Sequence, residues 1–520
     1  MTSVLIVGAG PTGLTLACDL ARRGIAVRII EKAPEYPRSS RAKGPNPRSL
    51  EVLDDLGVVD RILAAGAEPP VMRKYRDGRP IADTHPYEGS RPTPDAPYDR
   101  GWLIAQWRLE EVLRNRLAEY GVSVELATEL VGFAQDGDGV VATLADGGRI
   151  GARYLVGCDG GHSPVRKLLG VSFAGRTAED QVMVCGDVEL DGPDRDRWHQ
   201  WFDEDGAVML CPIPGTRSGW WFQAGPERDD DGSPVEPSRE GFQRLLDRHA
   251  RMPGARLTDA SLLSTYRVNV RMADRYRVGR AFLAGDAAHV HPIAGGLGMN
   301  TGIQDAFNLG WKLAAVLTGR AGADLLDTYE EERLPVAAWT LDLTSERLSA
   351  ALEAIKEPGG GLDVVFTPET TNLGLGYRWS SLSREPDGRR GAADEPGQDG
   401  PGGRLRAGDR APDAPCRDGA TGAPVRLFEV FAGPHFTLLG FGAGSAPALR
   451  EAAAAHGDAV RVCAVDAGPE GLLDDRGHAR SAYGITGDAL VLIRPDNHVA
   501  LTAPADDARA VTDYLEGLGR

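Results

Sequence analysis

The sequence predicts an α/β protein in three parts: a domain built on a parallel sheet, an antiparallel sheet inserted into that domain, and a separate C-terminal α/β domain. Three observations predict this organisation. The chain opens with an apolar run, a glycine turn and a helical pattern. Its texture changes to short β-branched and aromatic runs between residues 176 and 270, and a segment rich in Gly, Pro, Asp and Arg precedes residue 411. A length of 520 residues suffices for two or three hydrophobic cores.

The first domain is predicted to begin with a βαβ unit. Residues 4–7 and 27–30 are short apolar runs, and residues 14–23 between them have helical patterning. Two later apolar runs, 154–161 and 281–286, each lead into an aspartate although they are far apart in the sequence. We expect them side by side in the same parallel sheet.

The rest of the chain is divided by changes of composition. Four runs separated by turn-rich segments are typical of an antiparallel sheet: 181–190, 207–214, 220–224 and 262–270. A helical pattern follows at 325–355. The predicted parts are the first domain in two pieces (1–175 and 271–384), the inserted sheet (176–270), a linker (385–410) and the C-terminal domain (411–520). In that last domain we expect strands at 436–439, 460–465 and 489–493, and a helix at 446–455.

The composition makes several classes of partner unfavourable. The formal net charge is −17, and no run of Lys and Arg is present to neutralise phosphates or anionic lipid, so nucleic acid and membrane surfaces are poor partners. No segment approaches the roughly 20 apolar residues of a membrane span. The six cysteines lack CxxC or zinc-ligand spacing, which indicates neither disulfides nor structural zinc and favours a reduced, cytoplasmic location.

The glycine turn GAGPTG carries the first chemical signal. Gly8, Gly10 and Gly13 have the G-x-G-x-x-G spacing between a strand and a helix, and Glu31 stands at the tip of the second strand. Glycine lets the backbone approach a pyrophosphate at a helix N-terminus, and an acid at the position of Glu31 accepts hydrogen bonds from ribose. In that context the motif predicts a dinucleotide site of Rossmann type.

Two further stretches carry chemistry. In CDGGHSPVRK, Asp159 follows a strand, although such a sequence alone is more often a turn. In GDAAHVHPIAGGLGMN, residues 285–300, an aspartate and two histidines precede glycines and a helix that Asn300 or Thr301 can cap. The H-x-H spacing leaves a metal site open, but the missing further ligand favours packing or loop hydrogen bonding for His289 and His291, so we predict no metal.

These three stretches resemble, in order and spacing, the fingerprints of the single-component FAD-dependent aromatic hydroxylases, the para-hydroxybenzoate hydroxylase family. Beyond residue 411, the stretches LFEVFAG, FTLLGFG and LVLIRPDNHVAL are similar to the thioredoxin-like tail of the phenol hydroxylase branch, which bacterial polyketide-tailoring hydroxylases share. The resemblance implies an FAD-binding domain, an inserted substrate-binding sheet with a substrate-side segment near 76–100, and a thioredoxin-like domain. Because the tail lacks CxxC, we expect it to be structural or to form a homodimer.

The resemblance also implies roles for individual residues. Asp286 would bind the ribityl chain of FAD, and Asp159 would lie near the pyrophosphate. The backbone from Gly296 to Met299 would face the flavin ring, and Arg41 and Gln106 match positions near the flavin, although Arg41 could be a surface residue and Gln106 could lie at a helix start. The full predicted cofactor set is Gly8, Gly10, Gly13, Glu31, Lys32, Arg41, Gln106, Asp159, Asp286, Pro292, Gly296, Leu297, Gly298, Met299 and Asn300.

The implied reaction is hydroxylation of a phenolic ring, in which NADPH or NADH reduces FAD and O₂ forms a C4a-hydroperoxide. A polycyclic aromatic polyketide is the favoured substrate, as in antibiotic tailoring; small phenols or phenylpropionates, Baeyer–Villiger oxidation and non-oxygenating flavin reduction are the alternatives. No catalytic base is assigned, and His199 or Arg217 would be guesses. The pocket wall is predicted to include Trp201, Met209, Trp220, Phe222, Tyr266 and Ile293, although alternating apolar residues of a strand are more often simple core.

Overall fold

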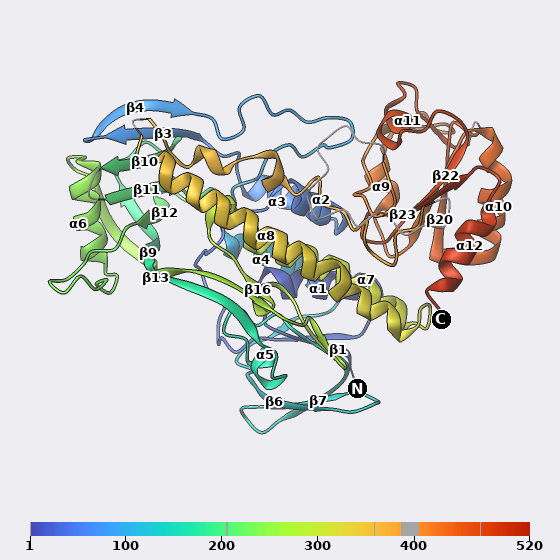
Figure 1. Ribbon diagram of the computed structural model, residues 1–520, viewed down its shortest axis with the longest axis horizontal. Helices are drawn as coiled ribbons and strands as arrows, with labels where there is room; N and C mark the ends of the chain where they lie inside the picture. Colours follow the sequence, from blue (N-terminus) through green and yellow to red (C-terminus); the bar gives the residue numbers. More distant parts are fainter. Residues whose placement is uncertain (1, 204–205, 358, 386–404, 469, 520) are drawn as a thin grey trace.

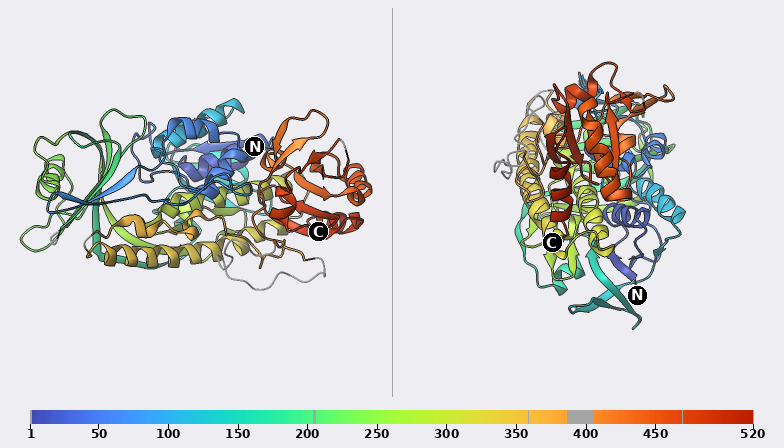
Figure 2. Two further views of the ribbon diagram at one scale, coloured as in Figure 1. Left: turned by 90° about the horizontal axis from the view of Figure 1, so that it is seen from above. Right: turned by 90° about the vertical axis from the view of Figure 1, so that its right-hand side faces the viewer.

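The chain folds into an elongated body with the first domain in the middle, the second sheet at one end and the C-terminal domain at the other (Figures 1 and 2). The computed structural model describes residues 2–203, 206–357, 359–385, 405–468 and 470–519. Most of the predicted linker, residues 386–404, lies outside the described residues.

The first sheet has a parallel centre in the order β15-β8-β1-β2-β5, with β14 at one edge and the β6–β7 hairpin paired to β8. Its strands are β1 (Thr2–Val7), β2 (Val27–Ile30), β5 (Val124–Glu125), β6 (Leu130–Gln135), β7 (Val140–Leu144), β8 (Arg149–Gly157), β14 (Arg277–Val278) and β15 (Ala281–Leu283). The predicted pairing of the two distant runs is confirmed, since β8 and β15 are parallel neighbours with Leu155 opposite Ala281. The ends of both strands therefore meet at one edge.

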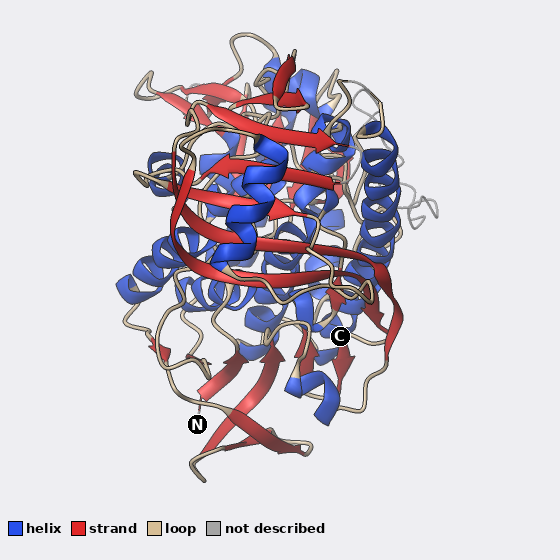
Figure 3. Cartoon of the chain, turned by 90° about the vertical axis from the view of Figure 1, so that its left-hand side faces the viewer, coloured by secondary structure: helices blue, strands red, loops and turns tan. Residues whose placement is uncertain are grey.

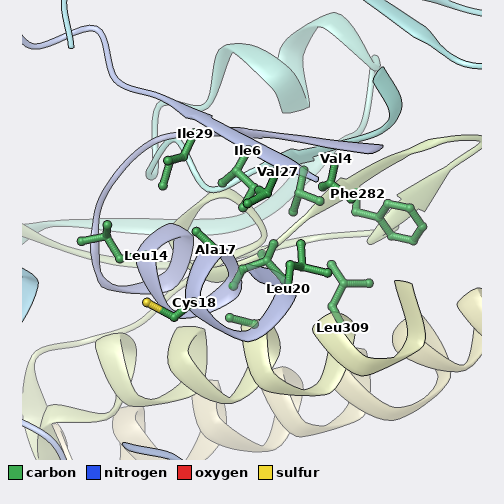
Figure 4. Packing of buried hydrophobic residues seen from close by; sticks show 14 of the residues in the cluster. Val4, Ile6, Leu14, Ala17, Cys18, Leu20, Val27, Ile29, Phe282 and Leu309 are labelled. Carbon is green, nitrogen blue, oxygen red and sulfur yellow. The ribbon is translucent and has the colours of Figure 1, made fainter. Parts of the chain in front are cut away.

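Helices cover this sheet and bring the glycine turn beside the 285–300 stretch. They are α1 (Pro11–Arg22), α2 (Pro47–Asp55), α3 (Val59–Ala65), α4 (Gln106–Glu119), α5 (Pro164–Leu168) and α7 (Leu297–Leu317). Leu14, Ala17 and Leu20 of α1 pack against the sheet (Figure 4). Helices α1 and α7 approach closely at glycine, because a Cβ at Gly310 would lie 2.2 Å from the Asp19 carboxylate. This packing holds the N-termini of both helices on the same side of the domain.

The second sheet has the order β16-β13-β9-β12-β11-β10-β3-β4 and is antiparallel except for β10 and β3. Its strands are β3 (Val71–Arg76), β4 (Arg79–Thr84), β9 (Phe173–Asp191), β10 (Arg197–Asp203), β11 (Gly206–Pro212), β12 (Gly219–Ala224), β13 (Arg256–Ala273) and β16 (His289–Val290). It extends beyond the predicted 176–270, because it takes strands from residues 71–84 and from the 285–300 stretch. Strand β10 was not predicted, since His199 and Gln200 interrupt its apolar run.

The two faces of the second sheet differ. Helix α6 (Arg239–Ala250) lies across the outer face (Figure 3). There Trp201, Trp220 and Phe222 are fully buried in one core cluster with Phe242 of α6, whose ring stacks on Phe222 at 4.5 Å. These three residues, predicted for the pocket wall, are therefore core residues of the outer face. Their neighbours along each strand point to the inner face, because side chains alternate across a sheet.

The long helix α8 (Asp327–Ala354) runs along the body from the C-terminal domain toward the second sheet (Figure 1). Its apolar and polar residues are mixed around the helix, and a proline, Pro335, lies within it. No helix among the described residues is both long and apolar enough to cross a membrane.

The C-terminal domain is a mixed sheet in the order β18-β17-β21-β20-β19-β22-β23 with helices on both faces. Its elements are β17 (Pro415–Asp418), β18 (Pro424–Arg426), α9 (Leu427–Phe431), β19 (Phe436–Phe441), α10 (Ala446–His456), β20 (Val460–Val465), β21 (Leu472–Leu473), α11 (His478–Tyr483), β22 (Ala489–Ile493), β23 (Val499–Pro504) and α12 (Ala508–Gly517). Trp311 of α7 contacts Phe436 edge-on at 5.8 Å and joins this domain to the first. The three strands and the helix expected here are confirmed, while the thioredoxin-like character stays a prediction.

Candidate functional site

The glycine turn leaves bare backbone at the start of α1. Gly8 has φ of +101°, and a Cβ there would lie 2.3 Å from the carbonyl oxygen of Cys158. A Cβ at Gly13 would lie 2.0 Å from the carbonyl oxygen of Gly8, whereas one at Gly10 would meet nothing within 4 Å. Two glycines therefore permit close packing within the protein, and the middle one faces open space at a helix N-terminus. That arrangement fits a pyrophosphate group.

Glu31 anchors this turn from the end of β2. Its carboxylate accepts hydrogen bonds from the backbone N–H groups of Ala9 and Ala33, both at 3.0 Å. The side chain remains half-buried, so each oxygen keeps a lone pair for a further donor such as a ribose hydroxyl. The neighbouring Lys32 is exposed.

Two aspartates end neighbouring strands of the first sheet. Asp159 accepts from the N–H of Val165 at 3.0 Å, and its other oxygen is buried without a partner. Desolvation by the surrounding protein raises the pKa of both Asp159 and Asp286, and for Asp286 His289 and Arg41 act in the opposite direction. Although protein atoms surround much of Asp286, the residue keeps an exposed surface between buried neighbours, so a ligand can reach its carboxylate.

Arg41 and Gln106 are in contact, as their shared assignment to the flavin side requires. The side-chain oxygen of Gln106 accepts from the backbone N–H groups of Arg41 and Ala42, at 3.1 and 3.2 Å. Gln106 is the first residue of α4. The arginine side chain is exposed. The glutamine thus shapes the loop that carries Arg41, whose charge opposes the rise in the pKa of Asp286.

The glycine-rich end of the 285–300 stretch forms a tight double turn. Gly295 and Gly296 have φ of +78° and +64°, and α7 begins at Leu297 with Gly296 as its N-cap. The expectation that Asn300 or Thr301 caps this helix is therefore wrong, because both lie inside the helix, as its fourth and fifth residues. Asn300 instead donates to the carbonyl of Gly296 at 2.7 Å and accepts from the N–H of Asn46 at 2.8 Å.

Side chains around this turn leave mainly backbone on its open side. Pro292 and Leu297 are buried, and Met299 is half-buried against the main core. A Cβ at Gly298 would have only the His291 ring nearby, at 3.8 Å. The side chain of Leu297 therefore does not lie on the open face.

The two histidines form a buried hydrogen-bonded chain. His289 Nδ1 lies 2.8 Å from His291 Nε2, and His289 Nε2 lies 2.7 Å from Asp305, which also accepts from Arg333 at 2.7 Å. The charges of Arg333 and His289 hold the pKa of Asp305 well below its usual range despite its burial. Within the described ranges, no group of three acidic, histidine or cysteine residues has the arrangement of a metal site. The hydrogen bonds of the two histidines link them to each other and to Asp305 of α7.

Sequence reasoning missed Asp305, although an acid within the apolar pattern of α7 was a visible signal. It also missed an ionic cluster where α7 and α8 meet the C-terminal domain, which we term the junction cluster: Lys312, Glu332, Arg494 and Asp496. Glu332 accepts from Arg494 at 2.6 and 2.9 Å and from Lys312 at 2.7 Å, and Arg494 also donates to Asp496 at 2.6 Å. All four side chains are at most 1% exposed. Every charge in it has an opposite partner.

The inner face of the second sheet lies toward the cofactor loops. Tyr266 donates to the carbonyl of His291 at 3.1 Å, Lys43 donates to Gln223 at 2.9 Å, and the N–H of Ser40 donates to Asp187 at 2.7 Å. Of the predicted pocket residues, Tyr266 lies on this face, and the register places Met209 opposite Gln223. Ile293, in the 285–300 stretch, is half-buried. Lys43 and Asp187 were missed because nothing in their sequence surroundings marks them.

The two other residues considered for proton transfer lie elsewhere. His199 is on the outer face, where Nδ1 lies 2.8 Å from the Tyr75 hydroxyl and the ring stacks on Trp201. Arg217 is exposed in the turn between β11 and β12. Neither faces the cofactor loops.

Comparison with known sequences matches both halves of the chain. Residues 1–344 match the family described as FAD binding domain, and residues 405–518 match that described as aromatic-ring hydroxylase, C-terminal. A flavin-dependent monooxygenase of Mycobacteroides abscessus is 41% identical over 99% of this chain and 99% of the relative. A 6-methylpretetramide 4-monooxygenase of Streptomyces rimosus is 34% identical over 99% of this chain and 93% of the relative.

Solved structures are similar over the same length. The flavin-dependent monooxygenase PieE in complex with FAD and substrate has a TM-score of 0.86 and 25% identity, covering 100% of this chain and 99% of that one. A ternary complex of aklavinone-11 hydroxylase with FAD and aklavinone has a TM-score of 0.82 and 31% identity, with the same coverage.

Proposed function

Because the chain belongs to the FAD-dependent aromatic hydroxylases, we propose that it hydroxylates a polycyclic phenolic substrate with O₂ and electrons from NADPH or NADH. The overall reaction inserts one oxygen atom into a ring C–H bond and reduces the other to water. It consumes one NAD(P)H and one proton. FAD, when bound, supplies the transfer of two electrons from the nicotinamide to O₂.

The observation that carries this proposal is the fit of the cofactor residues to FAD. Gly10 offers unobstructed backbone at the N-terminus of α1, and Glu31 stands ready for ribose. Asp286 presents an exposed carboxylate for the ribityl chain. The backbone of Gly296 and Gly298 would meet the flavin ring at the start of α7, where the helix dipole favours negative charge on that ring. Arg41 and Asp159 complete the set.

The residues around the site would orient the substrate and exclude water. The inner face of the second sheet lies opposite the 285–300 stretch, joined to it by the Tyr266 hydrogen bond. An aromatic substrate between them would contact Tyr266, Met209 and Ile293. Enclosing the reaction there favours transfer of oxygen to the ring over release of reduced oxygen to water.

The substrate class is inferred from relatives. Those named for 6-methylpretetramide and aklavinone act on fused-ring compounds, and they align with this chain over nearly its whole length. A fused-ring phenol of secondary metabolism is therefore the substrate that we propose.

The experiment is turnover of the FAD-loaded protein under ¹⁸O₂ with a panel of fused-ring and single-ring phenols. We expect a fused-ring phenol to stimulate NADPH oxidation and to gain one ¹⁸O atom on the ring. Label in a newly formed lactone would instead identify a Baeyer–Villiger reaction, and NADPH oxidation without any labelled product would overturn the monooxygenase proposal. Omitting FAD from a flavin-stripped sample is the control.

A further inference from the structure

Lys43 occupies an unusual position on the inner face of the second sheet. Its backbone is fixed, because its carbonyl accepts from the N–H of Ile104 at 2.8 Å. The ammonium group donates to Gln223 at 2.9 Å and lies 5.8 and 6.0 Å from the ring centres of Trp198 and Trp221. Both indoles are at least nine-tenths buried. The lysine therefore points into the sheet face and away from bulk solvent.

This ammonium group lacks an ionic partner within the part of the chain that the structure describes. No carboxylate there lies within 4.0 Å of it, and the hydrogen bond to Gln223 uses one of its three N–H donors. Asp187 lies on the inner face too, opposite Trp221, but its carboxylate accepts a hydrogen bond from the N–H of Ser40. Lys74, the other lysine of this face, pairs with Asp363 at 2.6 Å. Burial lowers the pKa of Lys43, because a desolvated ammonium without such a partner is costly, and an anionic ligand group beside it would offset that cost.

The neighbours of Lys43 lead toward the cofactor loops. Gln223 lies opposite Cys185 on β9. On the next strand, β13, Tyr266 lies opposite Met183 of β9, and its hydroxyl reaches the 285–300 stretch. Cys185 and Tyr266 are half-buried, whereas Trp198 and Trp221 are buried. A planar ligand against this half-buried part would thus lie within reach of both the 285–300 stretch and Lys43.

We propose that Lys43, held by Gln223, binds an ionised oxygen of the aromatic substrate, a phenolate or an enolate. This inference rests on the proposed function, since it assigns a group of the same substrate. Lys43 would donate one of its two remaining N–H groups to the oxygen, and Trp198 and Trp221 would exclude water from the contact. The selectivity that follows is for fused rings with an acidic hydroxyl.

The test measures binding to the FAD-loaded full chain by titration calorimetry, and so does not require turnover. The probes are 1,2-dihydroxyanthraquinone and its dimethyl ether, which has no ionisable oxygen. We expect the wild type to bind the diphenol about tenfold or more tightly than the ether, as a charge-assisted contact predicts. Lys43→Met should remove this preference, while Lys43→Arg retains it. Lys356→Met, at an exposed lysine of the α8 end, is the matched control.

Three results would overturn the inference: no preference in the wild type, the full preference in Lys43→Met, or an equal loss in the Lys356→Met control. If Lys43→Met loses its flavin absorbance, Lys43→Gln replaces it, because the amide keeps a donor without the charge. Failure of the proposed function is separate. It would be seen as absent ¹⁸O incorporation by the wild type, whatever the binding preference.

Discussion

The junction cluster and the inner face of the second sheet are both polar and both buried, but they differ in pairing. At the junction, Glu332 is shared by Arg494 and Lys312 at distances of 2.6 to 2.9 Å. On the inner face, Lys43 and Asp187 each bond to a neutral group, Gln223 and the Ser40 N–H. Complete pairing marks a structural role, whereas incomplete pairing marks the place where a ligand completes the set.

The pKa values of the buried carboxylates shift in opposite directions in the two regions. Although burial opposes it, the charges of Arg494 and Lys312 hold the pKa of Glu332 below its usual range. For Asp187, burial outweighs the hydrogen bond from Ser40 and the charge of Lys43, and its pKa rises to about 6. The protein therefore stabilises the ionised carboxylate in one region and disfavours it in the other.

The largest expected effect comes from breaking the junction cluster. Glu332→Ala leaves Arg494 and Lys312 buried without their shared carboxylate, and we expect it to lower the free energy of unfolding by about 3–5 kcal/mol. Thermal melting of the FAD-loaded protein measures this. A melting temperature equal to that of the wild type would show that the cluster is not structural.

The second-largest effect is expected at Asp187 of the inner face, as a dependence of stability on pH. Its folded pKa lies above its unfolded value, so its contribution to stability is greatest below about pH 4 and is lost as the pH rises through about 6. Asp187→Asn removes this penalty. We expect the variant to match the wild type at pH 4 and to exceed it at pH 8 by up to about 3 kcal/mol. Melting temperatures across this pH range measure the difference, and a constant difference would contradict the assignment.

Asp286 is the unpaired carboxylate on the cofactor side, and its removal should act on ligand binding more than on folding. Asp286→Ala is expected to weaken FAD binding by about 10- to 100-fold, since it removes a charge-assisted hydrogen bond worth about 1.5–3 kcal/mol. Fluorescence titration of the flavin-stripped protein measures it. Asp138→Ala, at an exposed turn of the β6–β7 hairpin, is the control and should bind FAD like the wild type.

The smallest effect is predicted for a paired but exposed site. Glu353 and Lys356 form an ion pair at 2.6 Å with side chains 74% and 65% exposed. Glu353→Ala should change the free energy of unfolding by less than about 0.5 kcal/mol, because water screens such pairs. A loss as large as that of Glu332→Ala in the same melting experiment would mean that burial does not explain the strength of the junction cluster.

Local pattern was sufficient for much of the first domain. The strand, glycine turn and helix around Gly8 to Gly13 are confirmed, as is the pairing of the two runs that end near Asp159 and Asp286. The assignment to the aromatic hydroxylases also came from these stretches and is confirmed by the family matches. Such motifs are readable because their residues are contiguous and their backbone geometry is local.

The inner-face prediction shows where local pattern ends. The apolar runs at β11 and β12 identified strands rich in aromatic residues, but they did not say which of the two faces α6 would cover. Trp201, Trp220 and Phe222 were therefore assigned to the pocket wall, while Trp198, Trp221 and Gln223 on the opposite face were missed. The N-cap of α7 was also predicted wrongly, at Asn300 or Thr301. The helix begins after Gly296, which caps it through a left-handed backbone conformation and not through a side chain, so no capping side chain marks the position.

The sequence by itself determined the βαβ turn, the acids that end its strands and the family to which the chain belongs, because each depends on residues close together in the chain. Only the tertiary structure decided which face of the second sheet meets the cofactor loops, that Asp305 joins His289 to Arg333, and that Lys43 lies against Gln223, 180 residues away. Those contacts form because elements far apart in the sequence pack together, and a local pattern of residues does not determine how such elements pack.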